Sequence, residues 1–136
     1  MLAGGVAAAS MVIAGTEVLN GAVFQVASAG DPNLNHALYD VANDLFFASG
    51  FGFAAFFAGA AVGVRVTGGL PSAMAPAALV VALVNLVGGV GFFAKSGFFA
   101  IGGAFGFIGP LVTLLWILAA SIVMVRPVPM ARSGTA

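Results

Sequence analysis

The chain contains no cysteine, which excludes disulfide bonds, thiol catalysis and metal sites with cysteine ligands. Charged residues are also scarce: they make up 6% of the 136 residues, against roughly a quarter in soluble domains. The four basic and four acidic side chains cancel, so the net charge gives no reason to expect a nucleic-acid partner. A single histidine cannot supply two axial haem ligands.

Known catalytic and cofactor-binding motifs are absent as well. The sequence has no Walker loop, no H-E-x-x-H zinc motif, no nucleophile elbow and no glycine-rich dinucleotide fingerprint. We therefore expect no enzymatic activity, no cofactor and no bound metal.

What the sequence does contain is apolar residues, at 62% of the chain with a mean hydropathy of +1.18. Crossing a hydrocarbon core of about 30 Å takes about 20 apolar residues per helix. Four segments meet this requirement, at about 3–28, 32–64, 72–93 and 107–125. The sequence thus predicts an all-α integral membrane four-helix bundle with up-down-up-down topology. Residues 1–127 would form one transmembrane domain, followed by a disordered tail at 128–136.

The second predicted span has a clear N-terminal start and is longer than a hydrocarbon core requires. Asp31 suits a helix N-cap and Pro32 the first helical position. From there to Val64 the helix would measure about 50 Å, too long for the hydrocarbon alone. Either its first three turns stand outside the hydrocarbon, or the helix breaks near Ser49–Gly50 or Gly52.

Two other segments leave alternatives open. Residues 98–106 could form an interfacial loop, a re-entrant piece or the start of the last helix. Residues 1–29 could instead be a signal peptide cleaved near Ser28. The lack of a preceding cation and the interruptions at Glu17 and Asn20 argue against cleavage. The chain could also be a fragment of a longer protein.

The few cations predict an orientation. Three arginines, Arg65, Arg126 and Arg132, fall on one side of the predicted membrane, and Lys95 falls on the other. The positive-inside rule then places both termini in the cytoplasm, with the chain in a bacterial inner membrane. The expected partners are the lipid bilayer and either further copies of the chain or a larger membrane complex.

Polar residues cluster where the first two spans meet. The short connection makes these helices antiparallel neighbours, which puts Glu17 level with Asn43 and Asp44. If the polar faces meet, three carboxyls, an imidazole and several amides converge near the outer leaflet. The candidate proton or cation site consists of Glu17, Asn20, His36, Asp40, Asn43 and Asp44.

Such a cluster needs compensation because no lysine or arginine lies near it. One carboxyl must hold a proton, or a cation or His36 must balance the charge. Intramembrane carboxylates often mark ion pathways. The alternative interpretation is structural: the second-span residues are hydrated at headgroup level, and Glu17 is protonated and hydrogen-bonded to a neighbouring helix.

Other residues suit helix packing. Asn85 can join two helices through its amide, and small residues at i, i+4 spacing let helices approach closely. Trp116 lies in mid-span, where packing is expected, whereas Tyr39 suits an interfacial anchor. The predicted packing residues are Gly59, Gly63, Asn85, Gly102 and Gly106.

Several turns and helix ends resemble a known group of proteins. These are the stretch Arg65–Pro71 before an Ala/Val/Leu/Gly helix, the turn at 91–97, and Leu114–Ala119 before the closing Arg126–Pro127. Between Leu38 and Pro127 the chain is similar to uncharacterised multi-pass membrane proteins of high-GC bacteria, of the DUF4386 type. The resemblance implies a membrane location and assigns no residue a role.

The sequence leaves three functional hypotheses. The first is a small multi-pass membrane module without enzymatic activity, whose polar cluster is its one candidate site. The second is a subunit of a proton- or cation-coupled transporter or channel. The third, an intramembrane enzyme or quinone-binding subunit, would need His36, Asp40 and Glu17 to converge on one pocket.

Overall fold

The structure is a computed structural model that describes residues 1–26, 28, 30–94, 97–99 and 103–125. Over these residues the chain forms helices joined by turns, without a strand. The elements are α1 (Leu2–Gly21), the π-helical segment η1 (Ala22–Val26), α3 (Pro32–Thr67), α4 (Met74–Val90), the 3-10 helix η2 (Gly91–Phe93) and α5 (Phe105–Val125). The predicted all-α fold class is confirmed.

The long helix α3 is continuous. The Asp31 carboxylate accepts hydrogen bonds of 3.1 Å from the backbone N–H groups two and three residues on, and Pro32 is the first helical residue, as predicted. Gly68 ends the helix in the left-handed conformation, with φ of 63°. The 36 residues of α3 span about 54 Å. The alternative of a break near Ser49–Gly50 or Gly52 is therefore wrong, and α3 extends past the length of a hydrocarbon core.

The last two helices begin close to their predicted positions. Together α4 and η2 cover Met74–Phe93, and α5 begins at Phe105, with Pro110 inside it. Within the segment left open at 98–106, residues 97–99 form a turn and residues 105–106 belong to α5. Residues 100–102 lie outside the described part of the chain.

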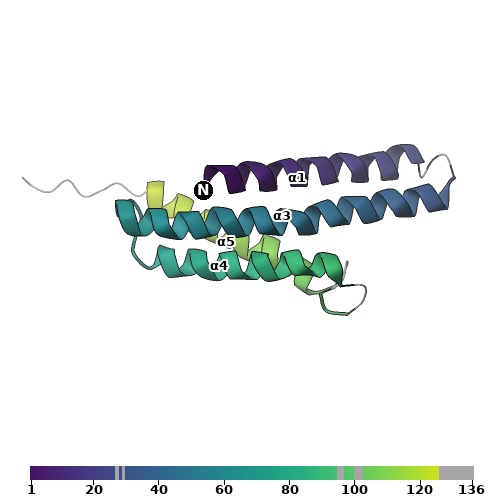
Figure 1. The fold of residues 1–136 in the computed structure, drawn as a ribbon. Coiled ribbons are helices and arrows are strands. Elements are labelled where there is room, and N and C mark those ends of the chain that lie inside the picture. Colours follow the sequence, from purple (N-terminus) through teal and green to yellow (C-terminus); the bar gives the residue numbers. More distant parts are fainter. Residues whose placement is uncertain (27, 29, 95–96, 100–102, 126–136) are drawn as a thin grey trace, which may run out of the picture.

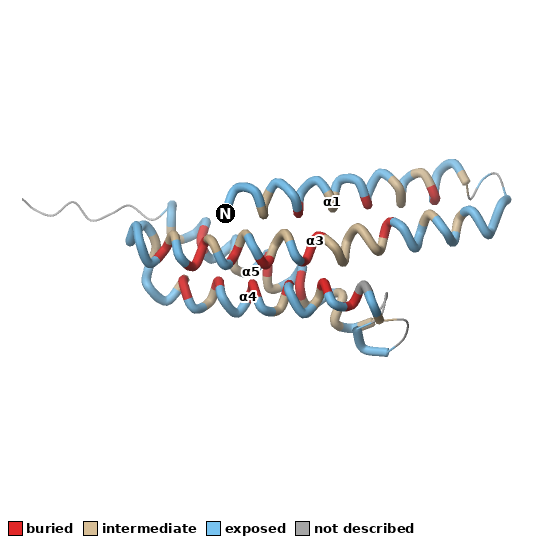
Figure 2. The backbone as a smooth tube through the Cα atoms, in the orientation of Figure 1, coloured by how far each residue is buried: buried red, intermediate tan, exposed pale blue. Residues whose placement is uncertain are grey.

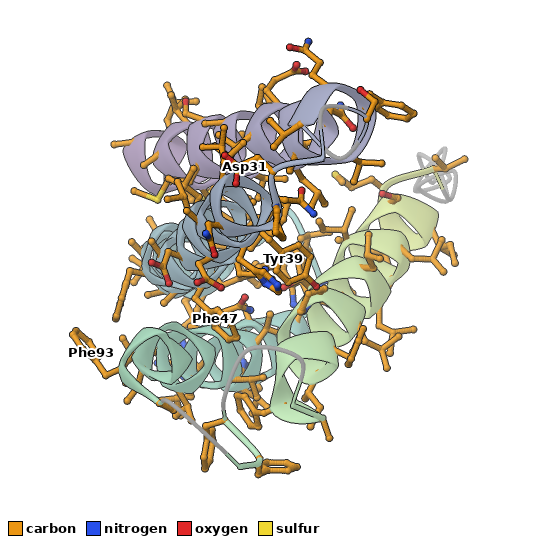
Figure 3. The ribbon with its side chains drawn as sticks, turned by 90° about the vertical axis from the view of Figure 1, so that its right-hand side faces the viewer. Asp31, Tyr39, Phe47 and Phe93 are labelled. Carbon is orange, nitrogen blue, oxygen red and sulfur yellow. The ribbon has the colours of Figure 1, made fainter. Side chains whose placement is uncertain are left out.

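The helices alternate in direction, and α3 lies at the centre of the arrangement. One side of α3 packs against α1 and another against α4, and α5 packs against α4 (Figure 1). In the end view, α1 lies on one side of α3 and α4 on the opposite side, while α5 flanks both α3 and α4 (Figure 3). The α3–α5 contact includes Phe57 and Trp116, whose rings meet edge to face at 5.2 Å.

The end of α4 and the start of α5 meet α3 at the level of Phe47. An added Cβ at Gly91, after the last residue of α4, would lie 2.8 Å from the Phe47 ring, and one at Gly106, in the first turn of α5, would lie 3.8 Å from it. On the other side of α3, Gly15 of α1 faces Leu45 and Phe46. Among the described α-helices, α1 and α3 continue well beyond this level, together with η1 (Figure 1).

We call residues 16–44 the hairpin projection, and residues 2–15 together with 45–125 the apolar block. Figure 1 shows the projection running past the ends of α4 and α5. Its α3 portion, from Pro32 to Asp44, is about 20 Å long at 1.5 Å per residue.

Burial is concentrated in the apolar block (Figure 2). Its core cluster combines one large side chain, the fully buried Phe57, with small and β-branched residues. The other members are Ala60, Ala61, Ala78, Val81 and Ala82. The projection has few buried residues, chiefly Ala22 and Ala42, where its two helices touch.

Three helical segments are long and apolar enough to cross a membrane: Leu2–Val26, Pro32–Thr67 and Phe105–Val125. The apolar helix α4 is shorter, at 17 residues. The twenty uncharged residues of α3, Leu45 to Val64, match a hydrocarbon thickness of about 30 Å.

Several predictions fall on undescribed residues. Of the cations used to predict orientation, only Arg65 is described; Lys95, Arg126 and Arg132 are not. The proposed tail at 128–136 and the residues flanking Ser28 at the possible cleavage site also lie outside the described ranges. Membrane orientation, the tail and the signal peptide therefore stay predictions.

Candidate functional site

The two helices of the hairpin projection are antiparallel, in the predicted register. An added Cβ on Gly15 would lie 3.1 Å from the Ala42 carbonyl oxygen, and one on Gly52 would lie 2.8 Å from the Ala8 nitrogen. This register places Glu17 level with Asn43 along the axis of the hairpin. The position of Glu17 along this axis therefore agrees with the prediction.

The direction in which Glu17 points differs from the prediction. Ala8, Gly15 and Ala22 are the buried residues of α1 and η1, and they form the face against α3. Two residues past Gly15, Glu17 lies about 200° around the helix, and its side chain is exposed. Asn20 is exposed on the same outer face. The expected meeting of the two polar faces is therefore wrong, because small residues, and not the polar ones, pack against α3.

The polar residues of α3 form a second, separate stripe. His36 and Asp40 lie eleven and seven residues before Phe47, so each falls within about 20° of Phe47 on one face of the helix. Phe47 packs against the end of α4, as the contact with Gly91 shows. The stripe thus continues the α4-facing side of α3 beyond the end of α4, where nothing among the described residues covers it. His36 and Asp40 are both exposed.

Asn43 and Asp44 are half-buried near the base of the projection. The Asn43 amide donates a 2.7 Å hydrogen bond to the Tyr39 carbonyl oxygen of its own helix. Tyr39, predicted to be an interfacial anchor, is 49% exposed, and Figure 3 shows it on the side of α3 nearer to α4 and α5. The amide is used within α3, and it makes no bond to α1.

The six predicted site residues therefore occupy two faces. Glu17 and Asn20 lie on the outer face of α1; His36, Asp40, Asn43 and Asp44 lie on α3. In the described ranges no three His, Asp or Glu side chains come close enough to hold a metal ion. The pocket of His36, Asp40 and Glu17 that an enzyme or quinone site would require is not formed.

Charge is the property that the two faces share. All four carboxylate side chains of the chain, Glu17, Asp31, Asp40 and Asp44, fall within residues 16–44, together with its one histidine. No lysine or arginine lies in this segment, and all four basic residues lie outside it. With a neutral histidine the projection carries a charge of −4, whereas the rest of the chain carries +4. The mutual repulsion of the acids favours binding of cations.

The interior of the apolar block contains few polar groups, and these bond to one another or to backbone. The Asn85 amide, 4% exposed, donates 2.9 Å hydrogen bonds to the Val81 carbonyl oxygen and to the Thr113 hydroxyl. Asn85 therefore joins α4 to α5, which confirms its predicted role as a link between helices. Ser49 donates a 2.6 Å bond to the Phe46 carbonyl oxygen of its own helix.

The predicted packing glycines behave differently from one another. Gly59 permits a close approach, since a Cβ there would lie 2.8 Å from the Met1 nitrogen. A Cβ at Gly63 would meet only the Met1 sulfur, at 3.7 Å, and one at Gly106 only Phe47. Gly102 lies outside the described residues. The i, i+4 spacing thus identified one close contact on α3.

Sequence reasoning missed the tightest helix contacts. A Cβ at Gly50 would lie 2.7 Å from the Asn85 carbonyl oxygen, and Gly4 and Gly52 line the α1–α3 contact. The signal for the latter contact was present as a seven-residue repeat of small residues on each helix. The members are Ala8, Gly15 and Ala22 on the first helix, and Gly52 and Gly59 on α3.

Comparison of the chain with protein-family models, curated proteins and solved structures found no match. The resemblance to membrane proteins of the DUF4386 type is untested by this result and stays a prediction. The charge and geometry of the hairpin projection are therefore the features that indicate a function.

Proposed function

We propose that the chain is a non-enzymatic integral protein of a bacterial inner membrane that works as a docking module. The apolar block lies in the bilayer, where the part of α1 that belongs to it, residues 2–15, is about 21 Å long and so enters the hydrocarbon core without crossing all of it. The hairpin projection extends from the outer face of the membrane and binds a positively charged segment of another protein. The observation that carries the proposal is the coincidence of charge and shape: every acidic side chain lies in the segment that extends past α4 and α5.

The acids that are not used within the chain support docking: Glu17 and Asp40 are exposed, and Asp44 is half-buried. Among the described residues, no salt bridge or hydrogen bond occupies the side chains of Glu17, Asp40 or Asp44, whereas the Asp31 carboxylate caps α3. An acidic surface without internal cations attracts a basic partner and speeds its association, most strongly at low ionic strength. Two acidic faces on opposite sides of a hairpin give such a partner a surface to wrap around.

The alternative, a proton- or cation-coupled transporter, receives less support. Ionisable groups inside the membrane-spanning part are the usual mark of an ion pathway. Residues 45–136 contain no acid, and the buried polar side chains of the block are Ser49, Asn85 and Thr113. The outward direction of Glu17 removes the one carboxyl that was expected to face a neighbouring span.

Site-specific photocrosslinking in cells tests the docking proposal. A benzophenone amino acid replaces Tyr39 on the projection or, as the matched aromatic control, Phe107 on α5, which is 72% exposed. We expect a discrete protein adduct from position 39 and only lipid adducts from position 107. The adduct should disappear when Asp40→Asn and Asp44→Asn are combined, since both remove charge and keep side-chain size.

Two results would contradict the proposal. One is an adduct that persists unchanged in the neutralised variant, because the contact would then not depend on charge. The other is a proton or Na⁺ flux in vesicles containing the purified chain that is lost in Glu17→Gln, which would establish the transport alternative.

A further inference from the structure

The side of α3 that packs against α4 forms one seam along most of the helix. Its positions follow one another at alternating steps of four and three residues, the spacing at which two helices interlock their side chains. The residues of this seam are His36, Asp40, Asn43, Phe47, Gly50, Ala54, Phe57, Ala61 and Val64.

Burial along the seam changes where α4 ends. The seam positions within Gly50–Val64 are buried, the next two are half-buried, and His36 and Asp40 are exposed. The buried part lies against α4, since a Cβ at Gly50 would lie 2.7 Å from the Asn85 carbonyl oxygen. The spacing of the seam therefore continues past the helix that covers it.

The uncovered part of the seam has the length of a contact between helices. Together α4 and η2 end at Phe93, whereas the projecting part of α3, Pro32 to Asp44, is about 20 Å long (Figure 1). This length corresponds to between about three and four turns of a second helix. A helix in line with α4 would extend the α3–α4 contact at the same spacing, so the surface continues an interface that already exists within the chain.

The polar residues of the uncovered seam determine which helix can pack there. A helix that covers Asp40 removes water from its carboxylate, which costs free energy unless the new neighbour supplies a cation. Neither α1 nor α3 contains a lysine, and their one arginine, Arg65, lies at the opposite end of α3. Tyr39 lies beside Asp40 on the side nearer to α4 and α5 (Figure 3) and presents an aromatic ring to such a cation.

We propose that the uncovered seam binds a basic helix of the partner protein, in line with α4, with a lysine or arginine opposite Asp40. This contact rests on the docking function proposed above and specifies its face and the kind of segment that binds. Polar residues at seam positions fix the register and the choice of partner at a cost in stability. His36, Asp40 and Asn43 therefore disfavour an apolar helix and select a basic one.

Two helical peptides of identical composition test the occupant. Both consist of alanine, glutamine and the same number of lysines over about 14 residues, enough to cover the uncovered seam. In the first, the lysines recur at steps of four and three and share one face; in the second, they are spread around the helix. We measure fluorescence anisotropy of the labelled peptides with the purified chain in zwitterionic micelles at low ionic strength. The one-face peptide should bind about fivefold more tightly, the effect of one or two additional ion pairs.

Two variants separate the seam from net charge. Asp40→Asn and Glu17→Gln each remove one negative charge from an exposed side chain of the projection, but Glu17 lies on the outer face of α1, away from the seam. Asp40→Asn should weaken binding of the one-face peptide at least about threefold, and Glu17→Gln should weaken it clearly less, because its charge is screened by solvent and is not paired. Equal weakening by the two variants, equal binding of the two peptides, or binding of neither would overturn the inference.

Photocrosslinking in cells tests the same face with the partner itself. His36 lies in the seam, whereas Leu34 and Val41 lie more than about 90° around α3 from Phe47 and are each 48% exposed. The adduct formed from position 39 should also form from position 36, and it should be absent from positions 34 and 41. The same adduct from all these positions would refute binding at the seam and leave docking intact. Absence of the adduct at position 39 would refute docking itself, so the two failures can be told apart.

Discussion

The hairpin projection and the apolar block share the helices α1 and α3 but differ in how these helices are packed and charged. In the block, α3 contacts helices on opposite sides, and its residues include the fully buried Phe57. In the projection, the same helix touches α1 and η1, and its other faces are largely exposed and carry both polar residues and the apolar Leu34 and Val41. A single helix thus passes from a region packed between other helices to one that only α1 and η1 contact.

This difference indicates separate roles for the two regions. Close backbone contacts through glycine and alanine hold the block together, as expected where hydrophobic burial gives no drive between helices in lipid. The projection contributes little buried surface and all of the acidic charge. Changes in the block should therefore affect stability, and changes in the projection should affect interactions.

The largest effect on stability is expected where α3 meets α4. Gly50→Leu places a side chain where even a Cβ would lie 2.7 Å from the Asn85 carbonyl oxygen. We expect a loss of more than about 2 kcal/mol, because overpacking costs about 1–3 kcal/mol even when side chains can give way. Thermal unfolding in detergent micelles measures it. Gly21→Leu adds the same side chain in open space and should be tolerated. An equal loss of stability in both variants would show that the close approach at Gly50 does not contribute to stability.

A smaller effect is expected between α4 and α5. Thr113→Val keeps the shape of the side chain and removes the hydroxyl that accepts the Asn85 hydrogen bond. Such bonds contribute about 0.6 kcal/mol on average in membranes, and we expect a loss near that value in the same unfolding assay. Ser121→Ala serves as the control, because its exposed hydroxyl bonds only to the Ile117 carbonyl of its own helix. A loss no greater than that of the control would argue against the interhelical bond.

The smallest effect on stability is expected in the projection. Asp40→Asn combined with Asp44→Asn should change the unfolding free energy by less than about 0.5 kcal/mol, since neither carboxylate has a hydrogen bond or salt bridge among the described residues and the amide keeps the side-chain size. A large destabilisation would mean that these carboxylates have structural partners, and the contrast between the two regions would fail.

Much of the fold could be predicted from the sequence, because helix ends and spans are local properties. Asp31 and Pro32 marked the start of α3, and Asn85 stood out as the polar residue in an apolar span. The antiparallel register also followed from the short connection, which is why the depth of Glu17 was right.

Which face of each helix packs against its neighbour could not be predicted in the same way. Placing Glu17 against α3 assumed that polar groups attract one another across the contact. The contact instead selects the smallest residues, Ala8 and Gly15, because they allow the backbones to come closest. Which face packs depends on side-chain volume on both helices, and a seven-residue repeat of small residues was the better signal.

The proposed arrangement requires that one helix, α3, leaves the membrane near Asp44. The chain has no cysteine, so Tyr39→Cys and Ala58→Cys give single reporters at two exposed positions of α3. In intact vesicles with the projection facing outwards, a membrane-impermeant maleimide should label position 39 and should leave position 58 unlabelled until detergent is added. Equal labelling of both positions before detergent, or protection of position 39, would contradict the account.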